Sequence, residues 1–243
     1  MQKKVEGIVI STVDYKESSK IINILTENDG IIGLFARGSK NIKSPLRTTS
    51  TVLSYGIFYI NSNNKSLATL TEVDIIDNFK EIRKDLLKTN YSLFLVELVT
   101  QVYKHERKKD IYKILINGLK KINEGYDPNV ITSIIELKLL ENLGIKPNLN
   151  YCVGCQKKND IVTISSYRGG YICCNCAKEE YIYNIKTLKL IKMFYYIDLE
   201  KITKIDVSEP IKKELNLFIN DYYERYSGLY LKSKEFLDVL IKG

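Results

Sequence analysis

The clearest chemical signature in this sequence is a group of cysteines crowded into one short segment. Four of them form two C-x-x-C pairs, Cys152 with Cys155 and Cys173 with Cys176, and 17 residues separate the pairs. Each pair makes a tight turn that directs two thiolates to one point, and two such turns complete the tetrahedron that zinc favours. Four thiolates leave no position for water, so the pattern predicts one structural Zn²⁺ without metal-based catalysis.

The fifth cysteine, Cys174, is predicted to be spare because binding through it would give an unfavourable C-x-C spacing. A short strand at residues 161–164 and a turn at 168–170 supply a hairpin between the two pairs. One alternative is a redox dithiol, but no thioredoxin-like βαβ pattern surrounds these residues. The other is a motif that has lost its metal.

A second signature is the placement of charge. Residues 31–70 contain no Asp or Glu, although several basic residues fall there. Four of these lie in a segment rich in Gly, Ser and Pro: Arg37, Lys40, Lys43 and Arg47. A flexible loop of this kind can follow phosphates with its cations, hydroxyls and backbone N–H groups. We therefore predict a DNA-binding loop, with a merely solvated surface as the alternative.

Aromatic residues on the strand that follows the loop offer faces on which bases could stack. They are Tyr55, Phe58 and Tyr59. The competing interpretation, which is the commoner one in a small barrel, places them in the hydrophobic core.

Another basic cluster follows the first long helix. It comprises Lys104, Arg107, Lys108 and Lys109. The cluster is a second predicted DNA-binding site, but basic residues at this position also complement the negative end of the helix dipole. Its neighbour His105, the only histidine, is predicted to be a surface residue.

Motifs typical of the common enzyme classes are absent from the sequence. There is no G-x-x-x-x-G-K-[ST] loop, no G-x-G-x-x-G and no H-E-x-x-H. A single histidine leaves no nucleophile–base triad, and the acidic residues form no evident cluster for two-metal chemistry. We predict that the chain is not an enzyme, which disfavours a nuclease or a ligase.

The first part of the chain consists of segments typical of β-strands. Runs rich in β-branched and aromatic residues are separated by Gly, Asn and Asp. They lie at residues 5–10, 20–26, 31–36, 55–60 and 66–70, with a polar turn at 61–64. Five short strands predict a small closed barrel, with an OB-fold as the first candidate and an SH3-like barrel as the alternative.

From about residue 81 the apolar residues recur at helical spacing. One helix follows the stripe from Leu87 to Val102, and another runs from Ile111 to near Gly125. Asp127 and Pro128 supply an N-cap and a first-turn proline for a third helix, and three more helical segments follow the cysteines.

The predicted fold class is therefore α+β and multi-domain. A five-stranded OB-fold barrel at residues 1–80 precedes a helical domain at 81–150 and 180–243, and a zinc module at 151–179 is inserted in the helical domain. The formal net charge of +8 favours an anionic partner such as nucleic acid. No apolar run approaches a membrane span and no signal peptide is visible, which predicts a cytoplasmic protein without a membrane partner.

These features together resemble the bacterial RecO family of recombination mediators. The resemblance covers nearly the whole chain and is densest at residues 6–10, 14–20, Thr26 with Gly30, 36–40 and 141–147, and in the two C-x-x-C pairs joined through 169–172. The departures are the extra Cys174 and a set of acidic residues that offset the charge of the barrel: Asp14, Glu17, Glu27 and Asp29.

The resemblance implies an OB-fold, a helical domain and an embedded zinc module. It also implies binding of single- and double-stranded DNA, annealing of complementary strands, cooperation with RecR, and help in loading RecA onto strands coated by single-strand-binding protein. A nucleoid-associated location follows from these partners. An acidic C-terminal tail of single-strand-binding protein would fit the basic cluster at residues 104–109, next to the apolar stripe that ends at Val102 and Tyr103.

A zinc-ribbon factor of transcription or translation is the alternative function, because it would also combine a basic barrel with four cysteines. Such a protein would bind RNA or ribosomes in preference to DNA.

Overall fold

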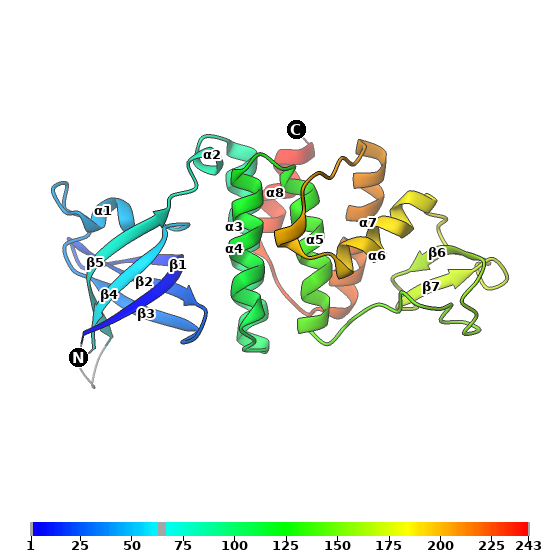
Figure 1. The fold of residues 1–243 in the computed structure, drawn as a ribbon, viewed down its shortest axis with the longest axis horizontal. Coiled ribbons are helices and arrows are strands. Elements are labelled where there is room, and N and C mark those ends of the chain that lie inside the picture. Colours follow the sequence, from blue (N-terminus) through cyan, green and yellow to red (C-terminus); the bar gives the residue numbers. More distant parts are fainter. Residues whose placement is uncertain (1, 63–66, 243) are drawn as a thin grey trace.

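The computed structural model describes residues 2–62 and 67–242. A β-barrel and a small β-hairpin lie at opposite ends of the long axis, and a group of helices separates them (Figure 1). Along this axis the chain forms a barrel, a helical part and a hairpin module.

The barrel consists of five strands: β1 (Gln2–Tyr15), β2 (Ser19–Thr26), β3 (Ile31–Ala36), β4 (Tyr55–Asn61) and β5 (Ala68–Asp77). They close in the order β1-β2-β3-β5-β4, with β3 and β5 parallel and the other pairs antiparallel. This closed arrangement confirms the OB-like barrel. The predicted turn at 61–64 and the predicted start of the last strand at residue 66 fall partly outside the described residues.

β1 is much longer than the predicted run at 5–10. Its first half pairs with β4 and its second half pairs with β2, and the register shifts between Val9 and Ser11. A bulge bends a strand and increases its twist, which lets one strand serve both neighbours around a small barrel. Inward-facing residues such as Val9, Ile22 and Phe58 are fully buried in the barrel core.

The segment between β3 and β4 is folded more tightly than a flexible loop. Successive turns at residues 37–43 lead into α1 (Leu46–Thr49), a single helical turn. Leu46 is buried in the barrel core, and the backbone N–H of Lys40 donates to the carbonyl of Ser18 at 2.9 Å. Arg47 therefore lies on a helical turn and not in a loop.

The helical part begins with α2 (Lys80–Arg83), α3 (Leu86–His105), α4 (Asp110–Asn123) and α5 (Pro128–Asn142). It resumes after the cysteines with α6 (Ile185–Tyr196), the short 3₁₀ helix η1 (Leu199–Lys201), α7 (Glu209–Tyr226) and α8 (Lys232–Lys242). None of the helices in these described ranges is long and apolar enough to cross a membrane.

The predicted start of the third helix is correct in position. Asp127 caps α5 by accepting hydrogen bonds from the backbone N–H groups of Asn129 at 2.9 Å and Val130 at 3.4 Å. Ser208 occupies the N-cap position of α7, but its side chain makes no capping hydrogen bond.

α5 lies at the centre of the helical part and packs against α3, α4, α6 and α7. α5 has buried residues on all of its faces, and they include Thr132, Ser133 and Glu136. The sequence predicts only one buried stripe, from Ile131 to Leu143, because periodicity detects the most apolar face and misses polar residues buried by several neighbours.

The barrel and the helices share one apolar core. Ile8, Leu25 and Tyr55 on the barrel pack in the same cluster as the buried residues of α3 and α4. At the other end, the hairpin of β6 (Ile161–Ser165) and β7 (Gly170–Cys173) contributes Ile164 and Tyr171 to this cluster. The helical core therefore holds both end modules.

Candidate functional site

The four predicted metal-binding cysteines meet at one point beside the β6–β7 hairpin. The Sγ atoms of Cys152, Cys155, Cys173 and Cys176 all lie within 4.8 Å of one another. A Zn–S distance of about 2.3 Å in a tetrahedron places sulfur atoms about 3.8 Å apart. The Sγ atoms of Cys155 and Cys173 are 3.5 Å apart, so the cluster fits a single structural metal ion.

Each C-x-x-C pair forms the expected tight turn. The N–H of Gln156 donates to the carbonyl of Cys152 at 2.8 Å, and the N–H of Cys176 donates to that of Cys173 at 2.9 Å. Gly154 is needed in the first turn because a Cβ there would lie 3.1 Å from the sulfur of Cys176 and 2.5 Å from Arg168 Nη2.

The surroundings of the thiols shift the pKa values of Cys152 and Cys176 in opposite directions. Desolvation opposes ionisation of Cys152, but hydrogen bonds from the backbone N–H groups of Cys173, Gly154 and Cys155 outweigh it and lower the pKa of this thiol to about 6. Hydrogen bonds to the Cys173 and Cys155 side chains raise the pKa of Cys176 to about 12. A cation bound at this point would favour the ionised form of all four thiols.

The cluster is attached firmly to the helical part. Cys152 and Cys173 are buried, and the hydroxyl of Tyr171 on β7 donates to the carbonyl of Leu188 on α6 at 2.9 Å. Cys174, by contrast, is exposed and lies outside the group of four.

The basic segment after β3 presents its predicted DNA-binding residues to solvent. Arg37, Lys40, Lys43 and Arg47 are all exposed. Lys40 forms an ion pair with Asp14 at 2.8 Å, and its hydrogen bond lowers the pKa of that carboxyl group. Among the residues that the structure describes, the side chains of the other three cations have no ion-pair partner.

The structure disfavours two of the predicted stacking residues. Phe58 is fully buried and Tyr55 is 6% exposed, while the half-buried Tyr59 donates to Asp74 at 2.7 Å. An exposed ring that the sequence argument missed lies beside the basic segment. Tyr15, at the end of β1, is 41% exposed and packs edge-on against Phe35. In the sequence this tyrosine only follows Asp14, and the ion pair that joins Asp14 to Lys40 is seen only in the structure.

The second basic cluster lies where α3 meets the turn between β2 and β3. Lys104 and Arg107 line a hollow of about 410 Å³ together with Asp29, Gly30, Ile31 and Tyr103. Lys109 Nζ donates to Asn28 Oδ1 at 3.1 Å, and Lys108 pairs with Glu106 at 2.8 Å.

The two basic clusters lie apart from each other. One follows the end of β3 and the other faces its beginning, at opposite ends of the β2–β3 hairpin. Six residues of strand span about 20 Å. Any single strand of nucleic acid that contacted both would have to follow the side of the barrel.

Fold and site together define a class: an OB-like barrel joined to a helical domain that carries a four-cysteine module. Comparisons with known proteins narrow this class. The family described as Recombination protein O N terminal matches residues 1–79, and Recombination protein O C terminal matches residues 83–235. This chain belongs to the RecO family of DNA repair proteins.

Relatives that match over nearly their whole length belong to the same family. The DNA repair protein RecO of Bacillus subtilis (strain 168) is 40% identical over 242 residues, covering 98% of this chain and 94% of the relative. The DNA repair protein RecO of Halalkalibacterium halodurans is 38% identical over 244 residues, covering 99% and 96%. The family resemblance seen in the sequence is thus confirmed, and with it a role in DNA repair and recombination.

Proposed function

We propose that this chain is a recombination mediator that binds single- and double-stranded DNA, anneals complementary strands and catalyses no covalent reaction. With RecR it promotes loading of RecA onto DNA coated by single-strand-binding protein. The observation that carries the proposal is the exposed cationic segment on an OB-like barrel in a chain that belongs to the RecO family; three of its four cations have no ion-pair partner among the described residues.

The proposed DNA contact begins at the segment after β3. Arg37, Lys43 and Arg47 are exposed and free of intramolecular ion pairs within the described ranges, so phosphates would meet no competing carboxylate there. On binding DNA, Lys40 would break its ion pair with Asp14 and bind a phosphate instead. Tyr15 lies next to this pair and supplies a ring on which a base can stack.

Annealing follows from these contacts without a catalytic residue. Two complementary strands repel each other through their phosphates, and basic side chains that neutralise those phosphates lower the barrier to pairing. The pairing edges of the bases stay free, because the basic side chains contact the backbone and a stacked ring covers only the face of a base.

The four cysteines are proposed to hold one structural Zn²⁺ through Cys152, Cys155, Cys173 and Cys176. Their chemistry supports zinc because a closed set of four thiolates suits a tetrahedral, redox-inactive ion. The metal would stabilise the hairpin module and would take no part in a reaction.

The second basic cluster is proposed to receive either DNA or the acidic tail of single-strand-binding protein. Lys104 and Arg107 line a hollow beside the half-buried Tyr103, which is the combination of cationic rim and partly apolar wall that an acidic tail with an apolar end requires. These partners imply a nucleoid-associated, cytoplasmic location, which is part of the same proposal.

Strand annealing with and without RecR tests the proposal. We expect the purified chain to accelerate pairing of complementary oligonucleotides, with a rate that falls steeply as salt increases. A competition between DNA and RNA of the same sequence should favour DNA. No annealing in either condition, or a clear preference for RNA, would contradict the proposal and would favour the zinc-ribbon RNA-binding alternative.

A further inference from the structure

One face of α6 is exposed to solvent although large apolar side chains lie on it. The helix packs against β6 and lies on the side of the helical part that carries the hairpin, away from the barrel (Figure 1). Ile185, Met193 and Tyr196 are 56%, 42% and 58% exposed. Their positions i, i+8 and i+11 fall on one face of a helix. The proposed DNA-binding and metal-binding roles use none of these side chains.

A pocket of about 360 Å³ opens between this face and the hairpin module. Leu188, which is 3% exposed, and the half-buried Ile161 line it together with Ile185 and Met193. The hydroxyl of Tyr171, which also lines the pocket, donates to the carbonyl of Leu188 at 2.9 Å. That hydrogen bond satisfies the phenol, so the pocket suits an apolar side chain and not a polar one.

The charge beside this pocket is positive. α6 contains no Asp or Glu but three exposed lysines: Lys186, Lys189 and Lys192. In the described part of the chain none of the three has an ion-pair partner, and two of them, Lys189 and Lys192, line the pocket. Glu214 of α7 contacts the start of α6, but its carboxylate already accepts from the backbone N–H of Asn184 at 2.9 Å and from the hydroxyl of Thr187. The lysines are therefore free to pair with carboxylates of another molecule.

A helix fits this surface better than an extended peptide. An extended peptide that adds to a sheet is recognised through free main-chain groups of its receptor, whereas a helix satisfies its own backbone and makes contacts through side chains. The surface between Ile185 and Tyr196 is the side of a helix, whose main-chain groups are used within it. This stretch is about 16 Å long, which matches about three turns of a second helix packed beside it.

We propose that the exposed face of α6 and its pocket form a docking site for an acidic amphipathic helix of a partner protein. An apolar side chain of that helix enters the pocket, and carboxylates on its flanks pair with Lys189 and Lys192. A DNA strand would use the lysines but leave the apolar pocket unfilled, which favours the protein partner. The site lies away from the barrel, so a partner held there leaves the proposed DNA-binding segment free. This inference does not depend on the DNA-binding proposal.

A fluorescein-labelled helical peptide of about 15 residues, roughly four turns, is the probe. Leucines form one stripe along it and glutamates flank the stripe. Fluorescence anisotropy on the full chain should show saturable binding. The double variant Lys189→Glu, Lys192→Glu should lose at least about tenfold in affinity, because like charges then face each other. Ile185→Ser, Met193→Ser should also weaken binding, since it removes the apolar contacts, and both pairs are exposed, so the melting temperature should stay unchanged.

The matched control is the double variant Lys80→Glu, Lys204→Glu. It makes the same change in net charge at two exposed lysines outside α6 that have no ion-pair partner in the described ranges, and it should bind the peptide as the unmodified chain does. A second peptide of the same composition, with its leucines spread around the helix, should bind more weakly.

Three results would overturn the proposal: no binding of the striped peptide, equal binding of the two peptides, or equal losses in the two lysine variants. A loss of single-stranded DNA binding in Lys189→Glu, Lys192→Glu with unchanged peptide affinity would also overturn it and would assign this face to DNA. DNA annealing by the unmodified chain reports separately on the proposed function.

Discussion

Tyr112 of α4 donates a hydrogen bond to the carboxylate of Glu6 on β1, with 3.2 Å between Oη and Oε1. The same oxygen accepts a hydrogen bond from Tyr55 of β4 at 2.6 Å. One carboxylate thus binds two phenols, one from the barrel and one from the helical domain. This contact lies beside the shared apolar core and adds directional bonds to a junction that is otherwise held by packing.

Removing the phenol from α4 should weaken this junction. Tyr112→Phe keeps the buried ring and deletes one hydrogen bond to a charged acceptor, which contributes about 1.5 kcal/mol. We expect the free energy of unfolding, measured by urea denaturation, to fall by about this amount. Tyr59→Phe is the control, because its hydrogen bond to Asp74 is exposed. Equal effects of the two substitutions would show that the junction bond has no special role.

The same contact predicts that the free energy of unfolding falls at alkaline pH. Burial first, and then the hydrogen bond to Glu6, raise the pKa of Tyr55 from 10.0 to about 12. The stabilisation linked to this phenol is therefore complete below pH 10 and is lost as the pH rises from 10 to 12. Urea denaturation between pH 9 and 12 should show a steeper loss of stability for the unmodified chain than for Tyr55→Phe. Parallel curves would rule out this linkage.

The cysteine cluster predicts one zinc ion per chain in freshly purified, reduced protein. Cys152→Ser and Cys176→Ser should each lose the metal and lower the melting temperature, because a three-thiolate site binds zinc more weakly and the hairpin module loses its closure. Elemental analysis and thermal unfolding would measure both effects.

Cys174→Ser provides the matched control for these substitutions. Cys174 is exposed and lies outside the group of four, so the variant should retain the metal and its stability. Loss of zinc in Cys174→Ser with full zinc in Cys173→Ser would show that the fourth ligand has been assigned wrongly.

Binding of single-stranded DNA should depend on salt through the segment after β3. Four phosphate contacts predict a slope near −3 in a plot of log affinity against log salt, from roughly −0.7 per contact. Replacing Arg37, Lys40, Lys43 and Arg47 by Gln should flatten the slope and weaken binding to all sequences alike. Anisotropy titrations at several salt concentrations would measure it.

A second quadruple variant controls for the loss of net charge. Lys178, Lys186, Lys189 and Lys192 are exposed and lie on or near the hairpin module, away from the barrel. Replacing them by Gln removes the same charge and should leave the slope nearly unchanged. If both quadruple variants behave alike, the segment after β3 is only a solvated surface.

The last prediction separates the two uses proposed for the second basic cluster. The double variant Arg107→Glu, Lys108→Glu reverses charge beside the hollow at the β2–β3 turn. If the cluster receives an acidic tail, affinity for a peptide with the C-terminal sequence of a bacterial single-strand-binding protein should fall at least tenfold, since like charges then face each other. Unchanged peptide affinity with weaker DNA binding would assign the cluster to DNA.

Local patterns in the sequence were sufficient for several features of this protein. The two C-x-x-C pairs predicted which sulfur atoms would cluster, and the change from alternating to helical spacing near residue 81 predicted where the barrel would end and the helices begin. Both depend on residues close together in the chain. Backbone geometry at such short separations leaves few alternatives.

Other features depended on which buried faces meet, and periodicity cannot show this. It indicates that Ile8, Tyr55 and the stripe of α4 are buried, but not that they pack against one another or that Glu6 binds Tyr112 there. It also could not show that Tyr55 is core while Tyr15 is exposed.

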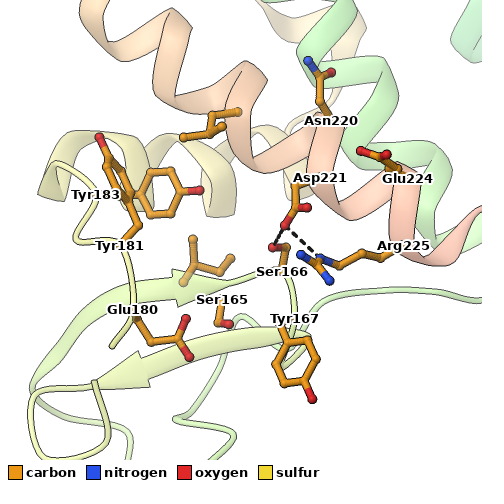
Figure 2. A pocket seen from close by; sticks show the side chains of 12 residues that line it. Ser165, Ser166, Tyr167, Glu180, Tyr181, Tyr183, Asn220, Asp221, Glu224 and Arg225 are labelled. Atoms are coloured by element: carbon orange, nitrogen blue, oxygen red, sulfur yellow. Dashed lines mark hydrogen bonds and ion pairs between the residues drawn. The ribbon is translucent and has the colours of Figure 1, made fainter. Parts of the chain in front are cut away.

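The pocket of about 500 Å³ between the β6–β7 hairpin and α7 is the strongest case of this kind (Figure 2). Glu180 and Glu224 are 44 residues apart in the sequence, and in a chain of net charge +8 neither attracts notice. Only the packing of the hairpin module against α7 places both in the lining of one pocket. The sequence by itself determined the order of the main elements and the cluster of four cysteines, whereas the tertiary structure decided the junction, the distance between the two basic clusters and this pocket. The reason is that long-range contacts are selected by the shapes of whole faces, and a linear pattern records only that a face is apolar.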